Sequence, residues 1–169
     1  QARATQDGPP PSSQLYVREF DQSEAVVLPG TEGAVGPIFS PDGQSVAFWS
    51  EGSLKKISLA GGLPVILTAM DAPFGASWGA ANNIAFAPKP YGGLMQVSAD
   101  GSANGDSPEV VTTPEEGEFS HRLPHFLPGS QAVLFTVRKR WLGSWQDAQI
   151  AVQSLVTGEK KILIENCAD

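Results

Sequence analysis

The sequence predicts an all-β fold, a partial β-propeller of about three and a half four-stranded antiparallel blades. A segment of about a dozen residues, PIFSPDGQSVAF at positions 37–48, returns as ASWGAANNIAF at 76–86 and as PHFLPGSQAVLF at 124–135. Its aromatic residue recurs about every 40 to 50 residues, which is the length of one propeller blade. The 18 glycines and 14 prolines interrupt most windows long enough for an amphipathic helix, so strands are expected throughout.

The expected elements follow one another along the chain. Residues 1–13 include GPPPSS and few apolar side chains, which is typical of a flexible arm. An outer half-blade is predicted at 14–30, where LYVREF and VVLPG read as two strands around a polar turn. Three four-stranded blades are expected at about 35–70, 75–113 and 122–165, each joining one copy of the aromatic repeat to a second strand pair.

Turn and core residues support these strands. Asp42-Gly43 lies between two short apolar strands, where glycine adopts the positive φ that a tight turn needs. Pro41 presets φ at the entry to that turn. Burial of each large aromatic contributes about 1.5–3 kcal/mol, so aromatics are expected to pack between neighbouring blades. These aromatics are Phe39, Trp78 and Phe126, with Phe48, Phe86 and Phe135 one hairpin later.

Composition excludes several classes of partner. The net charge of −7 argues against nucleic acid, because phosphate binding needs clustered basic residues. No apolar run reaches 18 residues, so no membrane insertion is expected. The single cysteine, Cys167, excludes an internal disulfide.

The repeat resembles a known family. FSPDG at 39–43, followed by an alternating strand, is similar to the Pro-Asp repeat of TolB and related bacterial propellers. LYVR at 15–18, LPGTEGA at 28–34, GASWG at 75–79 and SHR at 120–122 resemble the propeller that follows the kinase domain of bacterial eukaryote-like serine/threonine kinases. The resemblance covers about residues 14–165 and implies a sensor or interaction part that is periplasmic or otherwise extracytoplasmic. AANN at 80–83 and LPG at 127–129 lack the full turn motif, and no kinase signature is present, so no kinase activity is implied.

Candidate catalytic residues have simpler explanations. Ser77 lies in GASWG, which matches the nucleophile elbow of hydrolases, but that elbow needs a strand, a turn and a helix, and here a strand follows. His121 and His125 are four residues apart, yet Pro124 disfavours a helix, and on a strand they would share a face without a third metal ligand. We therefore expect no catalytic residues and predict that the chain is not an enzyme.

No cofactor and no bound metal are expected, with one weak calcium candidate. Asp100, Asn104 and Asp106 place oxygen ligands at alternate positions, as in the front half of a calcium loop. The twelfth position is Val111 instead of a bidentate glutamate, which favours a solvated hairpin tip.

The candidate interface is an insertion at 138–147 that lengthens one hairpin of the last blade. Arg138, Arg140, Trp141 and Trp145 combine basic and aromatic side chains, the composition of protein-interface hot spots. The alternative is that both tryptophans fold back over their own blade.

An open row of blades predicts self-association. Its uncovered strand edges and apolar blade faces invite pairing with another chain, and a dimer is the simplest form. The predicted function is a non-enzymatic module for protein–protein interaction or self-assembly. One alternative is an extracytoplasmic ligand-sensing module, for a small molecule or Ca²⁺ at the blade-top loops. The other is an enzyme or an accessory piece of one.

Overall fold

The computed structural model describes residues 13–101, 107–139 and 147–165. In these ranges fourteen strands form one two-stranded and three four-stranded antiparallel sheets. The half-blade consists of β1 (Tyr16–Val17) and β2 (Val26–Val27). The first blade consists of β3 (Val35–Phe39), β4 (Ser45–Ser50), β5 (Ser53–Ser58) and β6 (Val65–Ala69). The second consists of β7 (Ala76–Trp78), β8 (Asn83–Phe86), β9 (Met95–Ser98) and β10 (Glu109–Val110), and the third of β11 (Ser120–Phe126), β12 (Ala132–Arg138), β13 (Gln149–Ser154) and β14 (Lys160–Ile164).

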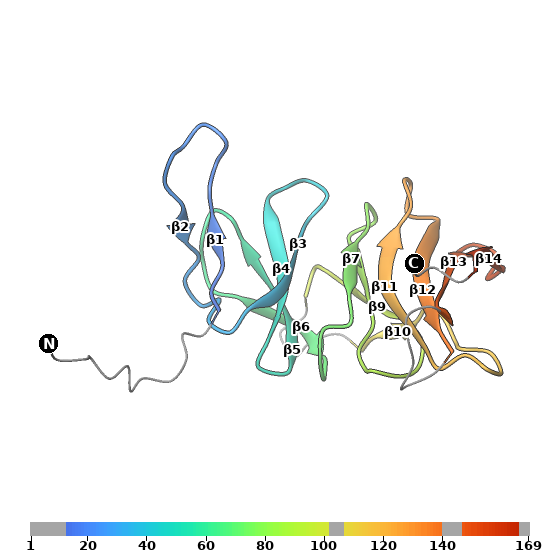
Figure 1. The fold of residues 1–169 in the computed structure, drawn as a ribbon. Helices are drawn as coiled ribbons and strands as arrows, with labels where there is room; N and C mark the ends of the chain where they lie inside the picture. The colour runs from blue at the N-terminus through green and yellow to red at the C-terminus, as the bar shows by residue number, and fades with distance from the viewer. Residues whose placement is uncertain (1–12, 102–106, 140–146, 166–169) are drawn as a thin grey trace, which may run out of the picture.

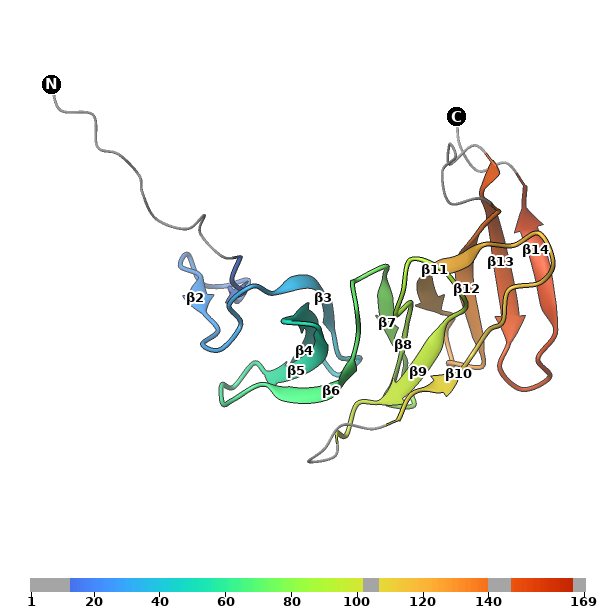
Figure 2. The same cartoon turned by 90° about the horizontal axis from the view of Figure 1, so that it is seen from below.

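The sheets stand side by side in chain order (Figure 1). Within each four-stranded sheet the strands also follow chain order, so every connection is a simple hairpin. The first strands of the three blades are neighbours, because β7 contacts both β3 and β11. Seen from below, the two ends of the row lie far apart (Figure 2). The fold is therefore a partial propeller, which confirms the predicted fold class.

The first blade shows how its turn forms. The carboxylate of Asp42 accepts hydrogen bonds from the Ser40 hydroxyl at 2.6 Å and from the Gln44 amide at 2.9 Å. The Ser40 bond and then the Gln44 bond hold the pKa of Asp42 below its usual value. Gly43 has φ +69°, as the turn requires. The second blade turns without this motif because Asn82 adopts the left-handed conformation instead, with φ +59°.

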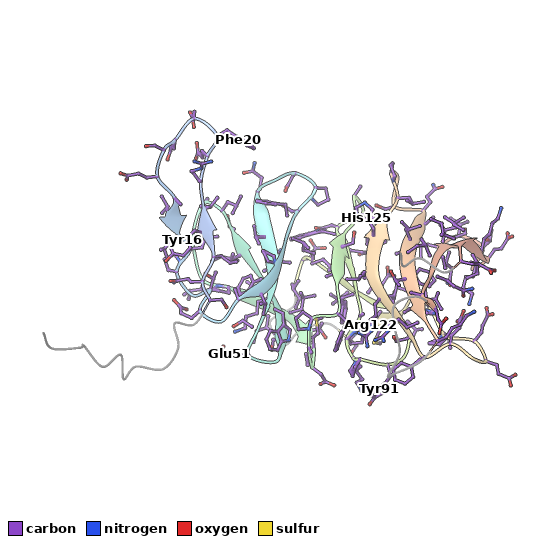
Figure 3. All side chains as sticks on the ribbon, viewed as in Figure 1. Tyr16, Phe20, Glu51, Tyr91, Arg122 and His125 are labelled. Carbon is purple, nitrogen blue, oxygen red and sulfur yellow. The ribbon has the colours of Figure 1, made fainter. Side chains whose placement is uncertain are left out.

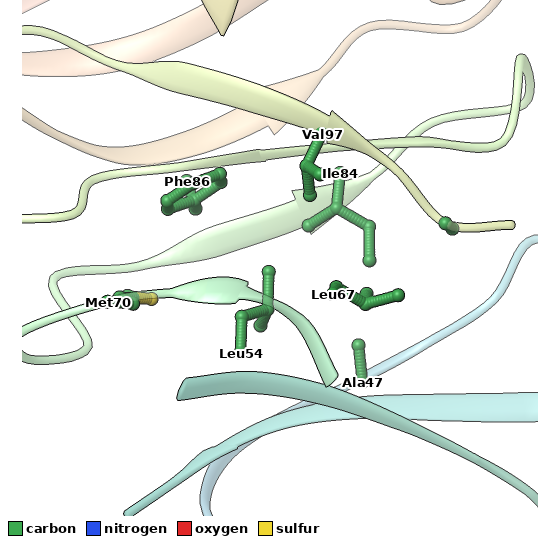
Figure 4. Close-up of a cluster of buried hydrophobic side chains, with 8 residues drawn as sticks. Ala47, Leu54, Leu67, Met70, Ile84, Phe86 and Val97 are labelled. Atoms are coloured by element: carbon green, nitrogen blue, oxygen red, sulfur yellow. The ribbon is translucent and has the colours of Figure 1, made fainter. Parts of the chain in front are cut away.

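Apolar side chains between neighbouring sheets form the core. Phe48, Phe86 and Phe135 are at most 1% exposed, which confirms their predicted packing. Phe86 lies in the cluster between the first and second blades, shown in Figure 4, whose buried members are Ala47, Leu54, Leu67, Met70, Ile84, Phe86, Val97 and Ala99. Phe135 belongs to the cluster between the second and third blades, and Phe48 to the one below the half-blade.

One predicted core aromatic is exposed. Phe39 was expected between blades, but 65% of its surface is accessible, whereas Phe126 in the matching position of the third blade is 8% exposed. Phe126 packs against Gly79, directly after β7 of the second blade, where a Cβ atom would come within 2.9 Å of its ring. In the part of the chain that the structure describes, the sheet that precedes Phe39 has two strands and covers it with no complete blade, so the prediction that Phe39 packs between blades is wrong.

Candidate interaction surfaces

An apolar groove of about 300 Å³ lies between β1 and the first blade. We call it the N-terminal groove; its lining residues are Leu15, Tyr16, Val17, Arg18, Leu28, Pro37, Phe39, Val46 and Leu59. The ring of Phe39 and the side chain of Val46 are neighbours because these residues are paired across β3 and β4. The groove thus has a floor from the inner strands of the first blade and a wall from β1.

The groove forms because the two-stranded sheet β1–β2 covers only part of the first blade. Leu28 of the half-blade is buried with Phe48 and Ile57 of the first blade, while Leu15 and Val17 pack against the same cluster. These contacts place β1 and β2 over the middle of the first blade, and β3 is left uncovered. In the described residues β2 is the only strand that pairs with β1, so the other edge of β1 borders the groove.

Two further aromatics are exposed at this end of the row. Tyr16 on β1 is 62% exposed, and Phe20 in the loop after β1 is fully exposed (Figure 3). Neither packs in a core cluster of the described residues. Exposed aromatics beside an apolar groove are unusual for a surface that meets only water.

The opposite end of the row carries a second apolar surface, which we call the C-terminal face. Its residues are Leu134, Ile150 and Val152, with His125 and Lys161 beside them, because Leu134 pairs with both His125 and Val152, and Val152 pairs with Lys161. Phe135 and Ala151 point the other way, into the core beneath the second blade. The described residues contain no further sheet packed against this face.

A buried polar network joins the second and third blades, and nothing in the sequence indicated it. Nδ1 of His121 lies 2.7 Å from Oγ1 of Thr112, and its Nε2 lies 3.0 Å from Oε2 of Glu118. The Leu94 amide donates to the same Thr112 hydroxyl, whose own proton is therefore free to be donated to Nδ1 of His121. Because Nδ1 then accepts, the proton of a neutral His121 ring lies on Nε2. Lys160 on β14 contacts Glu118 at 2.7 Å and Glu115 at 2.9 Å.

Burial sets the charges of this network. Desolvation is the main reason why the pKa of His121 lies below the usual 6.5, although Glu118 acts in the opposite direction. Burial also raises the pKa of Glu118, but hydrogen bonds from the Glu115 amide, Lys160 and His121 outweigh it and hold this pKa below its usual value. At neutral pH the network thus contains a neutral imidazole and an ionised Glu118 paired with Lys160.

Acid is expected to weaken the fold through His121. Because its pKa is lower in the folded chain than in the unfolded chain, the unfolded state binds more protons, and stability falls as the pH drops below about 6.5. Urea unfolding between pH 7 and about pH 5 measures this loss. His121→Phe should remove that part of the pH dependence, whereas His125→Gln, at an exposed histidine, should retain it. An unchanged pH profile for His121→Phe contradicts the assignment.

Arg122 also links the second and third blades. Its guanidinium carbon lies 4.5 Å from the centre of the Phe74 ring, and Nη2 donates to the carbonyl of Pro90 at 2.6 Å. Burial, and then the nearby charge of Arg138, lowers its pKa. The side chain is buried, so it stabilises the blade contact and does not face a ligand.

The structure places some of the predicted site residues and leaves others untested. Arg140, Trp141 and Trp145 lie outside the described residues, so the predicted hot spot stays a prediction. Arg138 ends β12 and pairs with Ser120. Ser77 is nearly buried, and its Oγ accepts the Phe126 amide at 3.0 Å, which is a contact between blades.

The two histidines do not share a face. A register shift between Arg122 and His125 turns the strand, so His121 is buried. His125, labelled in Figure 3, is exposed. The expectation that they would lie on one face is wrong because a bulge inverts the alternation of side chains. Between these positions Leu123 adopts φ +50°, next to Pro124.

The calcium candidate is described only in part. The carboxylate of Asp100 accepts the Asn82 side-chain amide at 2.7 Å and the Ser98 hydroxyl at 3.1 Å. Asn104 and Asp106 lie outside the described residues. Among the residues that are described, no group of three or more potential ligands could hold a metal ion. The same residues include no helix long and apolar enough to cross a membrane.

The fold is that of TolB-like β-propellers. The structure of a protein from Agrobacterium tumefaciens that is assigned as TolB matches 91% of this chain with a TM-score of 0.71 at 17% sequence identity. TolB from Acinetobacter baumannii matches the same share with a TM-score of 0.67 at 18% identity. This chain spans only 57% and 38% of those two proteins. No family model and no curated protein matches the sequence.

The fold also occurs in enzymes. An oligogalacturonate lyase from Vibrio parahaemolyticus matches 93% of this chain and is matched over 48% of its own length, with a TM-score of 0.62 at 14% identity. A prolyl endopeptidase matches 91% of this chain and is matched over 26% of its own length, with a TM-score of 0.64 at 12% identity. The prediction that the chain is not an enzyme, which relied on simpler explanations for Ser77 and the two histidines, is therefore wrong: this fold occurs in enzymes and does not separate them from binding modules.

Proposed function

We propose that the chain is a protein-interaction module that binds a protein partner at the N-terminal groove. The difference in exposure between Phe39 and Phe126 carries this proposal. Each is the last residue of the first strand of its blade, but Phe126 is buried and Phe39 is exposed. An aromatic in that position is built to pack against a neighbour. The exposed ring therefore marks a surface that a partner covers.

The groove offers both kinds of contact that bind protein chains. The edge of β1 that faces the groove can form backbone hydrogen bonds with an added strand. The rings of Phe39 and Tyr16 line the groove as large apolar anchors, and such anchors carry most of the binding energy in protein interfaces.

Phe39→Ser is expected to weaken association without weakening the fold. Because the ring is largely exposed, its loss should change the free energy of unfolding by no more than about 0.5 kcal/mol. Sedimentation velocity across the micromolar range measures association, and urea unfolding measures stability. We expect the variant to need a markedly higher concentration than the wild type to associate.

Leu63→Ser is the matched control, because Leu63 is 87% exposed but does not line the groove. It removes a similar apolar area from the surface and should leave association unchanged. The proposed function is overturned if Phe39→Ser associates like the wild type, or if the wild type binds no second chain.

We also propose that this propeller is related to the one that follows the kinase domain of bacterial eukaryote-like kinases. The segments LYVR, LPGTEGA, GASWG and SHR support this relation. The full reading frame tests it: a Gly-rich loop with His-Arg-Asp and Asp-Phe-Gly motifs upstream is expected, and a frame that contains the chain without them contradicts it.

A further inference from the structure

Charge is distributed unevenly along the row of blades. The third blade, residues 120–164, holds six basic and two acidic residues in a chain whose total charge is −7. Two of the basic residues do not charge its outer side, because Lys160 is paired with Glu115 and Glu118 and Arg122 is buried against the second blade. The other four basic and two acidic residues give a net charge of +2. The half-blade, residues 16–27, holds Arg18 with Glu19, Asp21 and Glu24, a net charge of −2. The two ends of the row are therefore oppositely charged.

The apolar surfaces at the two ends of the row also match each other: each is the kind of blade face that packs against the other kind inside the row. Each contact inside the row joins a face of one blade to the opposite face of the next blade, as in the clusters around Phe48, Phe86 and Phe135. Among the described sheets, the C-terminal face and the outer side of the half-blade are left without such a neighbour. If the third blade of one copy is placed next to the half-blade of another, the two sheets pack face to face in the same way as consecutive sheets within one chain.

We propose that the partner is a second copy of this chain, docked head to tail. The C-terminal face of one copy covers Tyr16 and the N-terminal groove of the other. This inference rests on the proposed function and names its partner. Charge favours this arrangement over the two symmetric ones, because pairing like ends would set +2 against +2 or −2 against −2.

The chain's own N-terminal arm is a poor occupant of the groove. Residues 1–12 contain no apolar side chain larger than alanine except three prolines, which cannot donate backbone hydrogen bonds to β1. An occupant of an apolar groove must bury apolar area. The C-terminal face offers it through Leu134, Ile150 and Val152.

Charge reversal at either end tests the docking. One variant carries Glu19→Lys and Glu24→Lys, which changes the half-blade from −2 to +2. The other carries Lys139→Glu and Lys161→Glu, which changes the third blade, without the paired Lys160 and the buried Arg122, from +2 to −2. All four side chains are exposed, so both variants should fold. We expect each variant alone to associate roughly tenfold or more weakly than the wild type in low salt.

Mixing the two variants is the decisive step. The mixture contains one interface with native charges, between the half-blade of the second variant and the third blade of the first. Mixed pairs should therefore form more tightly than either variant pairs with itself, as measured by sedimentation with one variant labelled. The control is Asp71→Lys with Glu116→Lys, which changes net charge by the same amount at exposed positions between blades and should associate like the wild type.

The outcomes separate this inference from the proposed function. A mixture no tighter than its components, or a control as weak as the end variants, overturns the head-to-tail contact. If Phe39→Ser still weakens association in that case, the groove remains the docking site and its occupant has a different surface. If Phe39→Ser has no effect, the proposed function fails as well.

Discussion

Phe86→Ala is expected to lower the free energy of unfolding by about 3–5 kcal/mol. The ring is fully buried on β8, in the cluster that joins the first blade to the second. Its removal leaves a cavity between two sheets, whose backbones cannot approach without disturbing their hydrogen bonds. Urea unfolding at neutral pH measures the loss, and near-native sheet content in circular dichroism shows that the variant still folds.

Phe39→Ala is the control for this prediction, because it removes the same atoms from an exposed site. At concentrations too low for association it should cost no more than about 0.5 kcal/mol. If the two truncations cost the same, Phe39 is a core residue and the first blade does not have an open face.

Gly93→Ala is expected to destabilise the chain by more than about 3 kcal/mol, the upper end of ordinary overpacking. A Cβ atom on Gly93 would collide with the carbonyl group of Thr112, which is backbone and cannot rotate away. The same threonine receives the Leu94 amide and contacts His121, so the collision would also disturb the network between the second and third blades. Thermal and urea unfolding measure the effect.

Gly117→Ala is the matched control. Its Cβ atom meets nothing within 4 Å, but the residue has φ +85°. It should therefore cost only the left-handed strain of alanine, about 1–2 kcal/mol. If both variants lose the same free energy of unfolding, the backbone of Thr112 does not lie close enough to Gly93 to exclude a Cβ atom.

The sequence predicted most of the strands because their signals are local. Alternation of apolar residues and the Asp42-Gly43 turn mark hairpins whose two strands are close in the chain. Phe48, Phe86 and Phe135 could be assigned to the core since each occupies the same position in a repeat. Repeats of this kind reveal the fold because each unit contacts mainly its neighbours.

The sequence could not predict features that depend on distant contacts. Phe39 carries the same local pattern as Phe126, but the described sheet that precedes it has two strands, whereas a four-stranded sheet precedes Phe126. The bulge that separates His121 from His125 involves the pairing of β11 with β12. The network of His121 with Glu118 and Lys160 joins residues up to 42 positions apart, and no motif marks it.

Hydrogen exchange at increasing protein concentration tests the central claim, that this row of blades has open ends covered by a partner, most directly. The account predicts that amides of residues 13–39 and of β12 and β13 exchange more slowly as concentration rises, while those of β8, inside the row, do not change. Exchange at both ends that is independent of concentration would contradict it.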